Sequence, residues 1–293
     1  MTLTAEQVET RRHHISSSNV VEKPQENVPF ADYLKWPHVS QSSLKEGRTS
    51  MLQMKSAMKN EKVATDGMNL SSALHCAFLE PELLIEKVVL WDAGVRRGKM
   101  WDEFKAEHKG KIILTNGYYK NLKGMLQQMR IHPEIRKWYA RPGEVEVSYA
   151  AEINGVMVKG RVDKLTDDPI IDLKASDVEL DPANEYALFL RHLVRMGWHI
   201  QGAIYCRLFK RKRFILCVVP MKDPWDPVMF EITSELLEIG DHQALMLLAA
   251  WKLCCANNHW PGRSDELVRL DVPKWMQPQI EITTGGVPVK LST

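Results

Sequence analysis

Two apolar runs in the middle of the chain constrain its fold more than any other feature. They are Val156–Leu165 and Ile170–Leu173, and the four residues Thr166-Asp167-Asp168-Pro169 separate them. Short polar stretches that end in proline are typical of turns, so the two runs are predicted to form a β-hairpin. The segments before and after this hairpin must supply the strands and helices that bury it.

Charged residues at the second run suggest a chemical role for the hairpin. Asp172 and Lys174 are two residues apart, so in a strand they lie on one face while Leu173 points into the core. Pairing with the first run brings Asp163 beside them. Two carboxylates and an ammonium group on one face are suited to hold a hard divalent cation and an attacking water. A solvated Asp/Lys pair on the surface gives the same short pattern, so the hypothesis needs further residues.

Composition places the chain among ordinary globular proteins. It has 293 residues, 44% hydrophobic and 26% charged, with a net charge of +2. This charge gives no general attraction for nucleic acid, so a nucleic-acid partner would need a local basic patch. The sequence contains neither a run of about 18 apolar residues nor a secretory signal pattern, and we expect a cytoplasmic protein without a membrane partner.

The cysteines argue against several classes of site. There are five of them, an odd number, and none forms a C-x-x-C pair. A disulfide framework, a zinc ribbon and an iron–sulfur cluster with regular spacing are therefore not expected.

Helical and strand patterns flank the hairpin. Residues 68–84 repeat apolar residues at helical spacing and include His75, which on spacing alone is more often structural than a ligand. The alternating strand Val145–Ala150 precedes the hairpin, and Asn154-Gly155 is the strongest turn signal in the chain. The middle of the protein is thus predicted to be a run of antiparallel strands flanked by helices.

The remaining elements follow from the same periodicities. Helices are predicted at 117–140, 186–210 and 234–257, and strands at 214–219 and 228–232. Gln201 and Tyr205 are four residues apart and share one helical face. For the domains, we expect a flexible N-terminal tail at 1–27, a single domain at 28–265 and an irregular C-terminal tail at 266–293.

The order of these features resembles the PD-(D/E)xK nuclease superfamily, and within it the RecE-like exonuclease VIII nuclease domains of phages and prophages. The resemblance covers about 33–260. Val39-Ser40-Gln41-Ser42-Ser43-Leu44-Lys45 is similar to the family's N-terminal S-x-S-x-L-K stretch. The helix Ser72-Ala73-Leu74-His75-Cys76-Ala77-Phe78-Leu79-Glu80-Pro81-Glu82 is similar to its longer and more specific histidine motif.

This resemblance implies a fold and a site. The expected fold is α/β (α+β), a restriction-endonuclease-like core whose central mixed sheet is flanked by helices. His75, Asp163, Asp172 and the Leu173 carbonyl become metal-site residues, and Lys174 becomes the lysine that acts on the attacking water. The remaining implied site residues are Glu146 on the preceding strand, with Glu144 left open as the alternative, and Gln201 and Tyr205 on the following helix, which support the site and meet the DNA strand.

The resemblance also implies an activity. The expected reaction is Mg²⁺-dependent hydrolysis, with Mn²⁺ as a substitute, of linear double-stranded DNA from its ends. The implied polarity is 5′ to 3′, which leaves 3′ single strands for a single-strand annealing recombination protein in the bacterial host. A homo-oligomeric ring occurs in related enzymes. The metal chemistry also follows from the residue types, whereas the polarity rests on the resemblance alone.

Two departures and three alternatives remain. A serine, Ser71 or Ser72, stands where the family usually has glycine, and Val162-Asp163 replaces the usual Pro-Asp. Neither change removes a charged group. The alternatives are a PD-(D/E)xK endonuclease, a helicase-associated nuclease and a catalytically silent DNA-binding module, and retention of both aspartates and Lys174 argues against the last.

Overall fold

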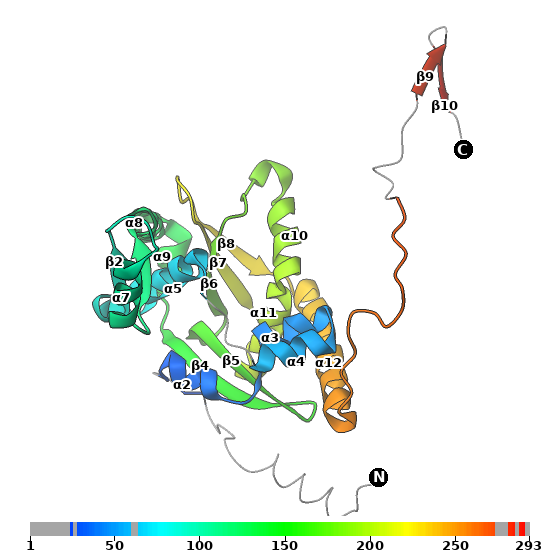
Figure 1. Cartoon of the computed structure of the whole chain (residues 1–293), viewed down its shortest axis with the longest axis horizontal. Coiled ribbons are helices and arrows are strands. Elements are labelled where there is room, and N and C mark those ends of the chain that lie inside the picture. The colour runs from blue at the N-terminus through cyan, green and yellow to red at the C-terminus, as the bar shows by residue number, and fades with distance from the viewer. Residues whose placement is uncertain (1–23, 26–27, 60–63, 273–280, 285–286, 291–293) are drawn as a thin grey trace, which may run out of the picture.

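The computed structural model describes residues 24–25, 28–59, 64–272, 281–284 and 287–290. Within them, one mixed sheet lies between two groups of helices (Figure 1). The strands of this sheet are β1 (Val39–Ser40), β4 (Gly143–Ile153), β5 (Val156–Thr166), β6 (Ile170–Ser176), β7 (Phe214–Pro220) and β8 (Val228–Ile232). The predicted fold class is therefore confirmed.

The helices fall on the two sides of the sheet in Figure 1. On one side lie α5 (Asp66–Leu79), α6 (Leu84–Lys87), α7 (Lys99–Glu107), α8 (Asn116–Ile131) and α9 (Pro133–Tyr139), with strands β2 (Val88–Trp91) and β3 (Ile112–Thr115). On the other lie α3 (Gln41–Leu44), α4 (Met51–Lys59), α10 (Ala187–Met196), α11 (Trp198–Phe209) and α12 (Ser234–Asn257). Short 3₁₀ turns are η1 (Lys45–Arg48), η2 (Pro81–Leu83) and η3 (Pro182–Asn184).

The sheet mixes parallel and antiparallel pairs. β5 pairs antiparallel with β4 and with β6, β6 pairs parallel with β7, and β7 pairs antiparallel with β8. The short strand β1 pairs parallel with the first half of β5. The predicted hairpin at the Thr166–Pro169 turn is confirmed, but only Lys164 and Leu165 pair with β6, at Ile171 and Ile170. Counted from the turn, the two strands of this hairpin therefore separate after Lys164, so that Asp163 lies at the point of separation.

Strand β7 is buried on both faces because alternate residues enter different cores. Phe214, Leu216 and Val218 pack with α11 and α12, whereas Cys217 and Val219 pack with α5 and α8. Leu173 of β6 joins the second core, and it is fully buried there, as predicted. The second core fixes helix α5 against β6, and this contact determines where His75 lies.

Two predicted helices are each divided. The helix expected at 117–140 consists of α8 and α9, because Pro133 cannot continue the hydrogen-bond pattern of α8. The helix expected at 186–210 consists of α10 and α11, separated by Gly197 at φ 70°. This left-handed conformation favours glycine and ends α10. Asp66–Leu79 is helical, as expected for the first part of the 68–84 segment.

The segments near both ends of the chain have structure of their own. Gln25, within the expected tail, exchanges two backbone hydrogen bonds with Ser148 of β4, at 2.8 and 2.9 Å. Residues 1–23 and 26–27 of that predicted tail lie outside the described residues. Helix α2 (Phe30–Lys35) follows. The C-terminal part, expected to be irregular, contains the antiparallel strands β9 (Glu281–Thr284) and β10 (Val287–Lys290). Within the described ranges, no helix is long and apolar enough to cross a membrane.

Candidate metal-dependent active site

Three carboxylates form a row across the sheet where its ladders are interrupted. The β4–β5 register pairs Val145 with Lys164 and Val147 with Val162, which sets Glu146 opposite Asp163. Asp163 and Asp172 are the first residues beyond the last β5–β6 pair, Lys164 with Ile171, and they are close enough for the Asp163 carboxylate to raise the pKa of Asp172, where burial is the larger cause. Residues opposite each other in antiparallel strands have neighbouring side chains on one face, which applies to Glu146 and Asp163. Glu146, Asp163 and Asp172 therefore come together from three adjacent strands.

Asp163 fills the gap where β5 and β6 separate. Its Oδ2 accepts the backbone N–H of Leu173 at 2.6 Å, a bond that replaces a ladder bond. In a β-strand the N–H and C=O of one residue point toward the same edge. The Leu173 carbonyl, predicted as a metal ligand, therefore faces the same gap as Asp163.

Helix α5 brings His75 to this row. Its Nδ1 lies 3.4 Å from Oδ1 of Asp163. One donor atom from each of His75, Glu146 and Asp163 lie within 4.8 Å of one another. Helical spacing alone favours a structural role for His75, and the family resemblance implies a metal-site role. The structure brings His75 into contact with the carboxylates.

Glu146 has an unusual backbone conformation for a strand residue. Its φ is 54°, in the left-handed region that non-glycine residues rarely occupy, and β4 makes no ladder pair at this position. Such conformations are typical of functional sites that the surrounding structure constrains. Oε2 of Glu146 accepts Nε–H of Arg161 at 2.5 Å. Between the two glutamates left open by the sequence, the geometry favours Glu146, because Glu144 is exposed and lies opposite Leu165.

Asp172 has a different set of partners. Its Oδ1 accepts Nε2–H of Gln201 at 2.7 Å, and its Oδ2 forms an ion pair with Nζ of Lys174. The ammonium group of Lys174 also lies 5.6 Å from the centre of the Trp198 ring. The predicted Asp172, Lys174 and Gln201 thus form one connected group, which borders Asp163.

Tyr205 lies in the core near the row, where burial and neighbouring groups that include Asp172 and Asp163 raise its pKa. Its side chain is buried in the core that α11 forms with the sheet, and an added Cβ at Gly160 would lie 3.0 Å from its ring. The tyrosine therefore supports strand β5 next to Arg161. Tyr205 and Gln201 are 7% and 6% exposed, and their predicted contact with a DNA strand stays a prediction.

The pKa values of the two aspartates are shifted in opposite directions. Burial lowers the pKa of His75, but the adjacent Asp163 carboxylate outweighs it and raises that pKa to about 9. For Asp163, burial raises the pKa, yet His75, Lys174 and the Leu173 N–H bring it below its usual value. Burial raises the pKa of Asp172 to about 6 despite Lys174. Burial and Asp163 also raise the pKa of Glu146 against the effect of Arg161.

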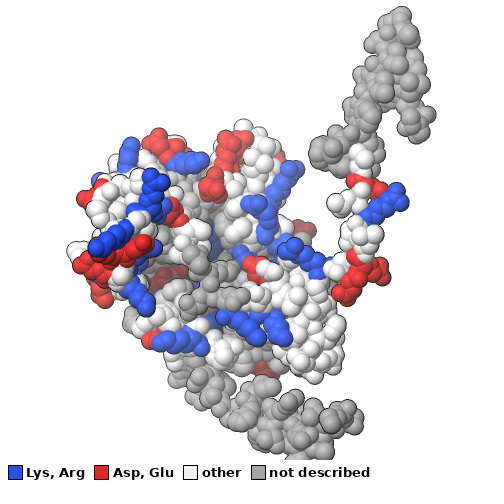
Figure 2. Space-filling model, viewed as in Figure 1, with Lys and Arg blue, Asp and Glu red and all other residues white. Residues whose placement is uncertain are grey.

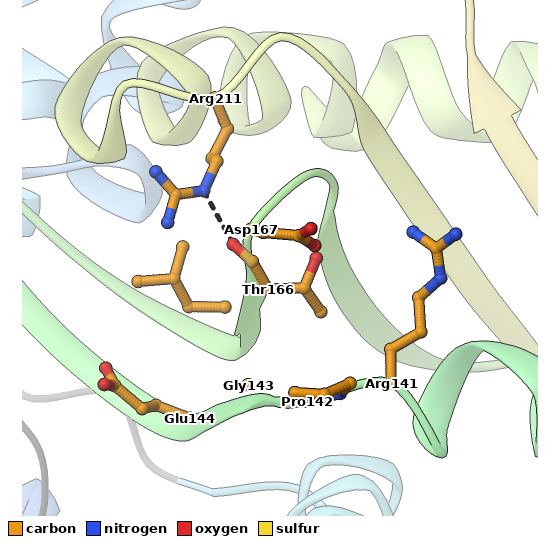
Figure 3. A pocket seen from close by; sticks show the side chains of 8 residues that line it. Arg141, Pro142, Gly143, Glu144, Thr166, Asp167 and Arg211 are labelled. Carbon is orange, nitrogen blue, oxygen red and sulfur yellow. Dashed lines mark hydrogen bonds between the residues drawn. The ribbon is translucent and has the colours of Figure 1, made fainter.

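A separate open cavity of about 560 Å³ lies farther along β4 and β5 (Figure 3). Its lining includes Arg141, Glu144, Asp167 and Arg211. The Arg211 Nε–H donates to the Thr166 carbonyl at 2.7 Å, as Figure 3 shows. None of the carboxylates of the row lines this cavity, so it is distinct from the candidate active site.

The donor set suits a divalent cation that prefers oxygen ligands. Glu146 and Asp163 offer carboxylate oxygens, the Leu173 carbonyl faces the same gap, and His75 offers a ring nitrogen. Mg²⁺ prefers oxygen ligands and retains waters, and imidazole suits transition metals such as Mn²⁺ better. The nearby residues therefore fit Mg²⁺ or Mn²⁺, provided that His75 is neutral when it acts as a ligand.

Arg161 is the residue of this site that sequence reasoning missed. It lies two positions before Asp163, so the period of a strand already places both on one face of β5. With His75 protonated, the cations His75, Arg161 and Lys174 balance the three carboxylates of the row.

The sheet with its row of carboxylates and Asp172-Leu173-Lys174 defines a PD-(D/E)xK-type nuclease core. Residues 40–270 match the family described as PDDEXK-like domain of unknown function (DUF3799), and the chain belongs to that family. A search among curated proteins found no match.

Two solved structures are similar to the chain. A protein from Eubacterium rectale, provisionally described as an exonuclease, has 15% identity and a TM-score of 0.57, with 93% of this chain and 97% of that chain covered. A phage-related exonuclease from Haemophilus somnus 129PT has 13% identity and a TM-score of 0.34, covering 76% of this chain and 96% of that chain. The first structure supports the assigned fold, and the second is too dissimilar to add to it.

Proposed function

We propose that the protein is a divalent-metal-dependent exodeoxyribonuclease that degrades linear double-stranded DNA from its ends. The observation that carries this proposal is the grouping of His75, Glu146 and Asp163 beside the Asp172–Lys174 pair. The family supports nuclease chemistry, and the exonuclease description of the similar Eubacterium rectale structure suggests action at ends.

Each side chain has a defined task in this proposal. A bound Mg²⁺ or Mn²⁺ supplies Lewis acidity to the scissile phosphate and a water for in-line attack. Glu146, Asp163, His75 and the Leu173 carbonyl would hold the ion. Asp172, which the family resemblance also implies as a ligand, lies outside the group of donor atoms and contacts Lys174 and Gln201, so we propose instead that it orients Lys174. Lys174 lowers the pKa of the attacking water and stabilises negative charge that develops on the phosphate.

Asp172 and Gln201 orient this lysine. The Gln201 amide donates to one oxygen of Asp172, and the other oxygen faces the Lys174 ammonium group. Because Asp172 is only 1% exposed, water competes little for these contacts. The chain of contacts from α11 therefore fixes the ammonium group before substrate arrives.

A basic area lies on the α10 side of the molecule, which the net charge of +2 did not predict. Lys and Arg side chains gather on the visible face over α10 and the α3–α4 segment (Figure 2). Arg191 and Arg195 of α10 and Arg48 of η1 are exposed. Positive side chains contact phosphates without reading sequence, which suits an enzyme that digests any duplex.

The finer parts of the proposal rest on the family resemblance. They are 5′ to 3′ polarity, action in the cytoplasm of a bacterial host on behalf of a phage or prophage, a single-strand annealing recombination protein as partner, and a ring-shaped homo-oligomer. Each requires its own test, and the reaction at Lys174 depends on none of them.

The proposal is tested with end-labelled linear duplex and a covalently closed circle, incubated with Mg²⁺ or with EDTA. We expect Mg²⁺-dependent loss of the linear DNA, with the circle intact. The Asp172→Ala and Lys174→Ala variants should both lose this activity. Cutting of the circle would instead identify an endonuclease. Absence of any metal-dependent cleavage would contradict the nuclease proposal.

A further inference from the structure

Arg161 connects the carboxylate row to the segment that precedes the nuclease core. Its Nε–H donates to Oε2 of Glu146 at 2.5 Å, and its Nη1–H donates to the Val28 carbonyl at 2.5 Å. Its guanidinium carbon also lies 5.7 Å from the centre of the Phe30 ring. One guanidinium group thus contacts both a candidate metal ligand and the backbone of the N-terminal segment.

The same segment is fixed to the sheet at further points. Gln25 pairs with Ser148, two residues beyond Glu146 on β4. The ammonium group of Lys159, two residues before Arg161 on β5, donates to the carbonyls of Tyr33, Leu34 and Trp36. The described part of residues 24–36, called the N-terminal strap below, therefore lies against the two strands that carry Glu146 and Asp163.

Glu146 needs an external partner to hold its position. Its backbone is in the left-handed region, its carboxylate is close to that of Asp163, and its side chain is 12% exposed. Repulsion between two poorly solvated carboxylates would drive Glu146 away from the row. Arg161 opposes this repulsion and occupies Oε2, which leaves Oε1 for another ligand.

We propose that Arg161 is a positioning residue that presents Glu146 to the divalent ion, and that it couples ion binding to docking of the N-terminal strap. This inference rests on the proposed function only in that a divalent ion binds at the row. The strap supplies the Val28 carbonyl, which holds the second nitrogen of the guanidinium group. Loss of the strap contact therefore loosens Glu146, and a bound ion tightens the strap.

The first test measures Mn²⁺ binding by calorimetry on the full chain, without DNA. Residues that orient metal ligands change affinity by about 10- to 100-fold when replaced, and we expect Arg161→Gln to weaken Mn²⁺ binding by about tenfold or more. Arg161→Lys keeps the charge but not the two-sided contact, so its affinity should lie between those of the wild type and Arg161→Gln.

Arg213→Gln is the matched control. Arg213, which directly precedes β7, donates from Nε and Nη2 to the carboxylate of Glu231 on β8, far from the row in sequence and on the β7–β8 side of the sheet. Its replacement should leave Mn²⁺ affinity unchanged. Circular dichroism of all three variants establishes that each retains the fold.

The second test measures hydrogen exchange at the backbone amides of Gln25 and Ser148. In the wild type and in Arg213→Gln, Mn²⁺ should slow exchange at both amides, and in Arg161→Gln it should not. Unchanged or increased Mn²⁺ affinity in a folded Arg161→Gln variant would overturn the positioning role. A wild type that binds Mn²⁺ with no change in exchange at these amides would overturn the coupling to the strap.

These outcomes are distinguishable from failure of the proposed function. A wild type that binds Mn²⁺ but cleaves no DNA would refute the nuclease proposal and leave the role of Arg161 intact. DNA cleavage by the wild type, together with equal Mn²⁺ affinity in the wild type and in Arg161→Gln, would support the nuclease proposal and refute the positioning role of Arg161.

Discussion

A carboxylate lies on each side of Asp163, and the two carboxylates have different neighbours. On the β4 side, Glu146 lies near His75 and Asp163, and all three can act as metal ligands. On the β6 side, Asp172 is bound by Lys174 and Gln201, neither of which is a usual ligand for Mg²⁺. The β4 side is therefore prepared to receive a cation, and the β6 side is prepared to place an ammonium group.

The pKa values show the same division. The pKa of Asp163 is lowered because cationic groups and an N–H face it, whereas burial raises the pKa of Asp172 to about 6. Asp163 is thus the more strongly anionic of the two at neutral pH. This difference teaches that identical residues in adjacent strands acquire separate tasks from their neighbours, and it can be tested from each side.

The largest effect is expected at Asp163, where the two sides meet. Asp163→Asn removes the central anionic ligand, and loss of several kcal/mol of metal-derived stabilisation corresponds to a fall of about 10³-fold or more in cleavage rate. Mn²⁺ affinity, measured by calorimetry, should fall with it. Asp167→Asn, in the exposed turn that lines the separate cavity, is the control and should retain activity. Equal losses of cleavage rate and Mn²⁺ affinity in both variants would contradict the central role of Asp163 as a metal ligand.

Lys174 should affect the rate without weakening metal binding. Lys174→Ala removes a group that acts on the attacking water and the phosphate, which is expected to cost about 10²- to 10³-fold in rate. Mn²⁺ affinity should stay constant or rise, because a nearby positive charge is lost. Single-turnover cleavage and calorimetry separate the two effects, with the exposed Lys212→Ala as control. A marked loss of Mn²⁺ affinity would place Lys174 on the metal-binding side instead.

Binding on the β4 side should depend on pH through His75. The pKa of His75 is raised to about 9, so the imidazole must lose a proton before it can bind an ion. Mn²⁺ affinity should therefore rise about tenfold per pH unit from pH 7 toward 9, and flatten above it. Calorimetry in buffers of different ionisation enthalpy should detect about one released proton. A His75→Gln variant with the same slope would refute this assignment.

The metal-free protein should show the matching trend in stability. Because the folded-state pKa of His75 exceeds its unfolded value of about 6.5, the associated stabilisation is fully present below pH 6.5. It is lost as the pH rises through about 9. The contribution of His75, obtained by comparing urea unfolding of the wild type and His75→Gln, should therefore decrease between these values.

The smallest effect is expected at Gln201. Gln201→Leu removes one hydrogen bond to Asp172 but no charge. A bond to a charged group contributes about 1.5–3 kcal/mol, so the rate should fall by about 10- to 100-fold. Mn²⁺ affinity should change little. Gln243→Leu, which breaks the contact of another helical glutamine with the buried His199, is the control. A loss at Gln201 as large as that at Asp163 would remove the distinction between the two sides.

Much of the fold could be predicted because its strands follow local patterns. The alternating run before Asn154-Gly155 and the turn at Thr166–Pro169 correctly placed β4, β5 and β6. The division of the two long helices could also have been predicted, because Pro133 and Gly197 are residues that interrupt helices. The parallel pairing of β1 with β5 and of β6 with β7 could not, because it joins segments distant in sequence.

The candidate site was predictable in its residues but not in its contacts. The Asn154-Gly155 turn alone fixes a register that sets Glu146, rather than Glu144, opposite Asp163. Strand period likewise places Arg161 beside Asp163, although nothing in the sequence indicates its bond to Val28. The proximity of His75 depends on packing of α5 against β6 and β7, which only the three-dimensional core reveals.

The most direct test of the account is a crystal soaked in Mn²⁺ and measured for anomalous scattering. We predict a peak in the gap between β5 and β6, coordinated by His75, Asp163 and the Leu173 carbonyl, with Glu146 as a further ligand. Lys174 should lie beside it and not bind it. A peak beside Glu144 and Asp167 in the separate cavity, or no peak at the carboxylate row, would contradict the account.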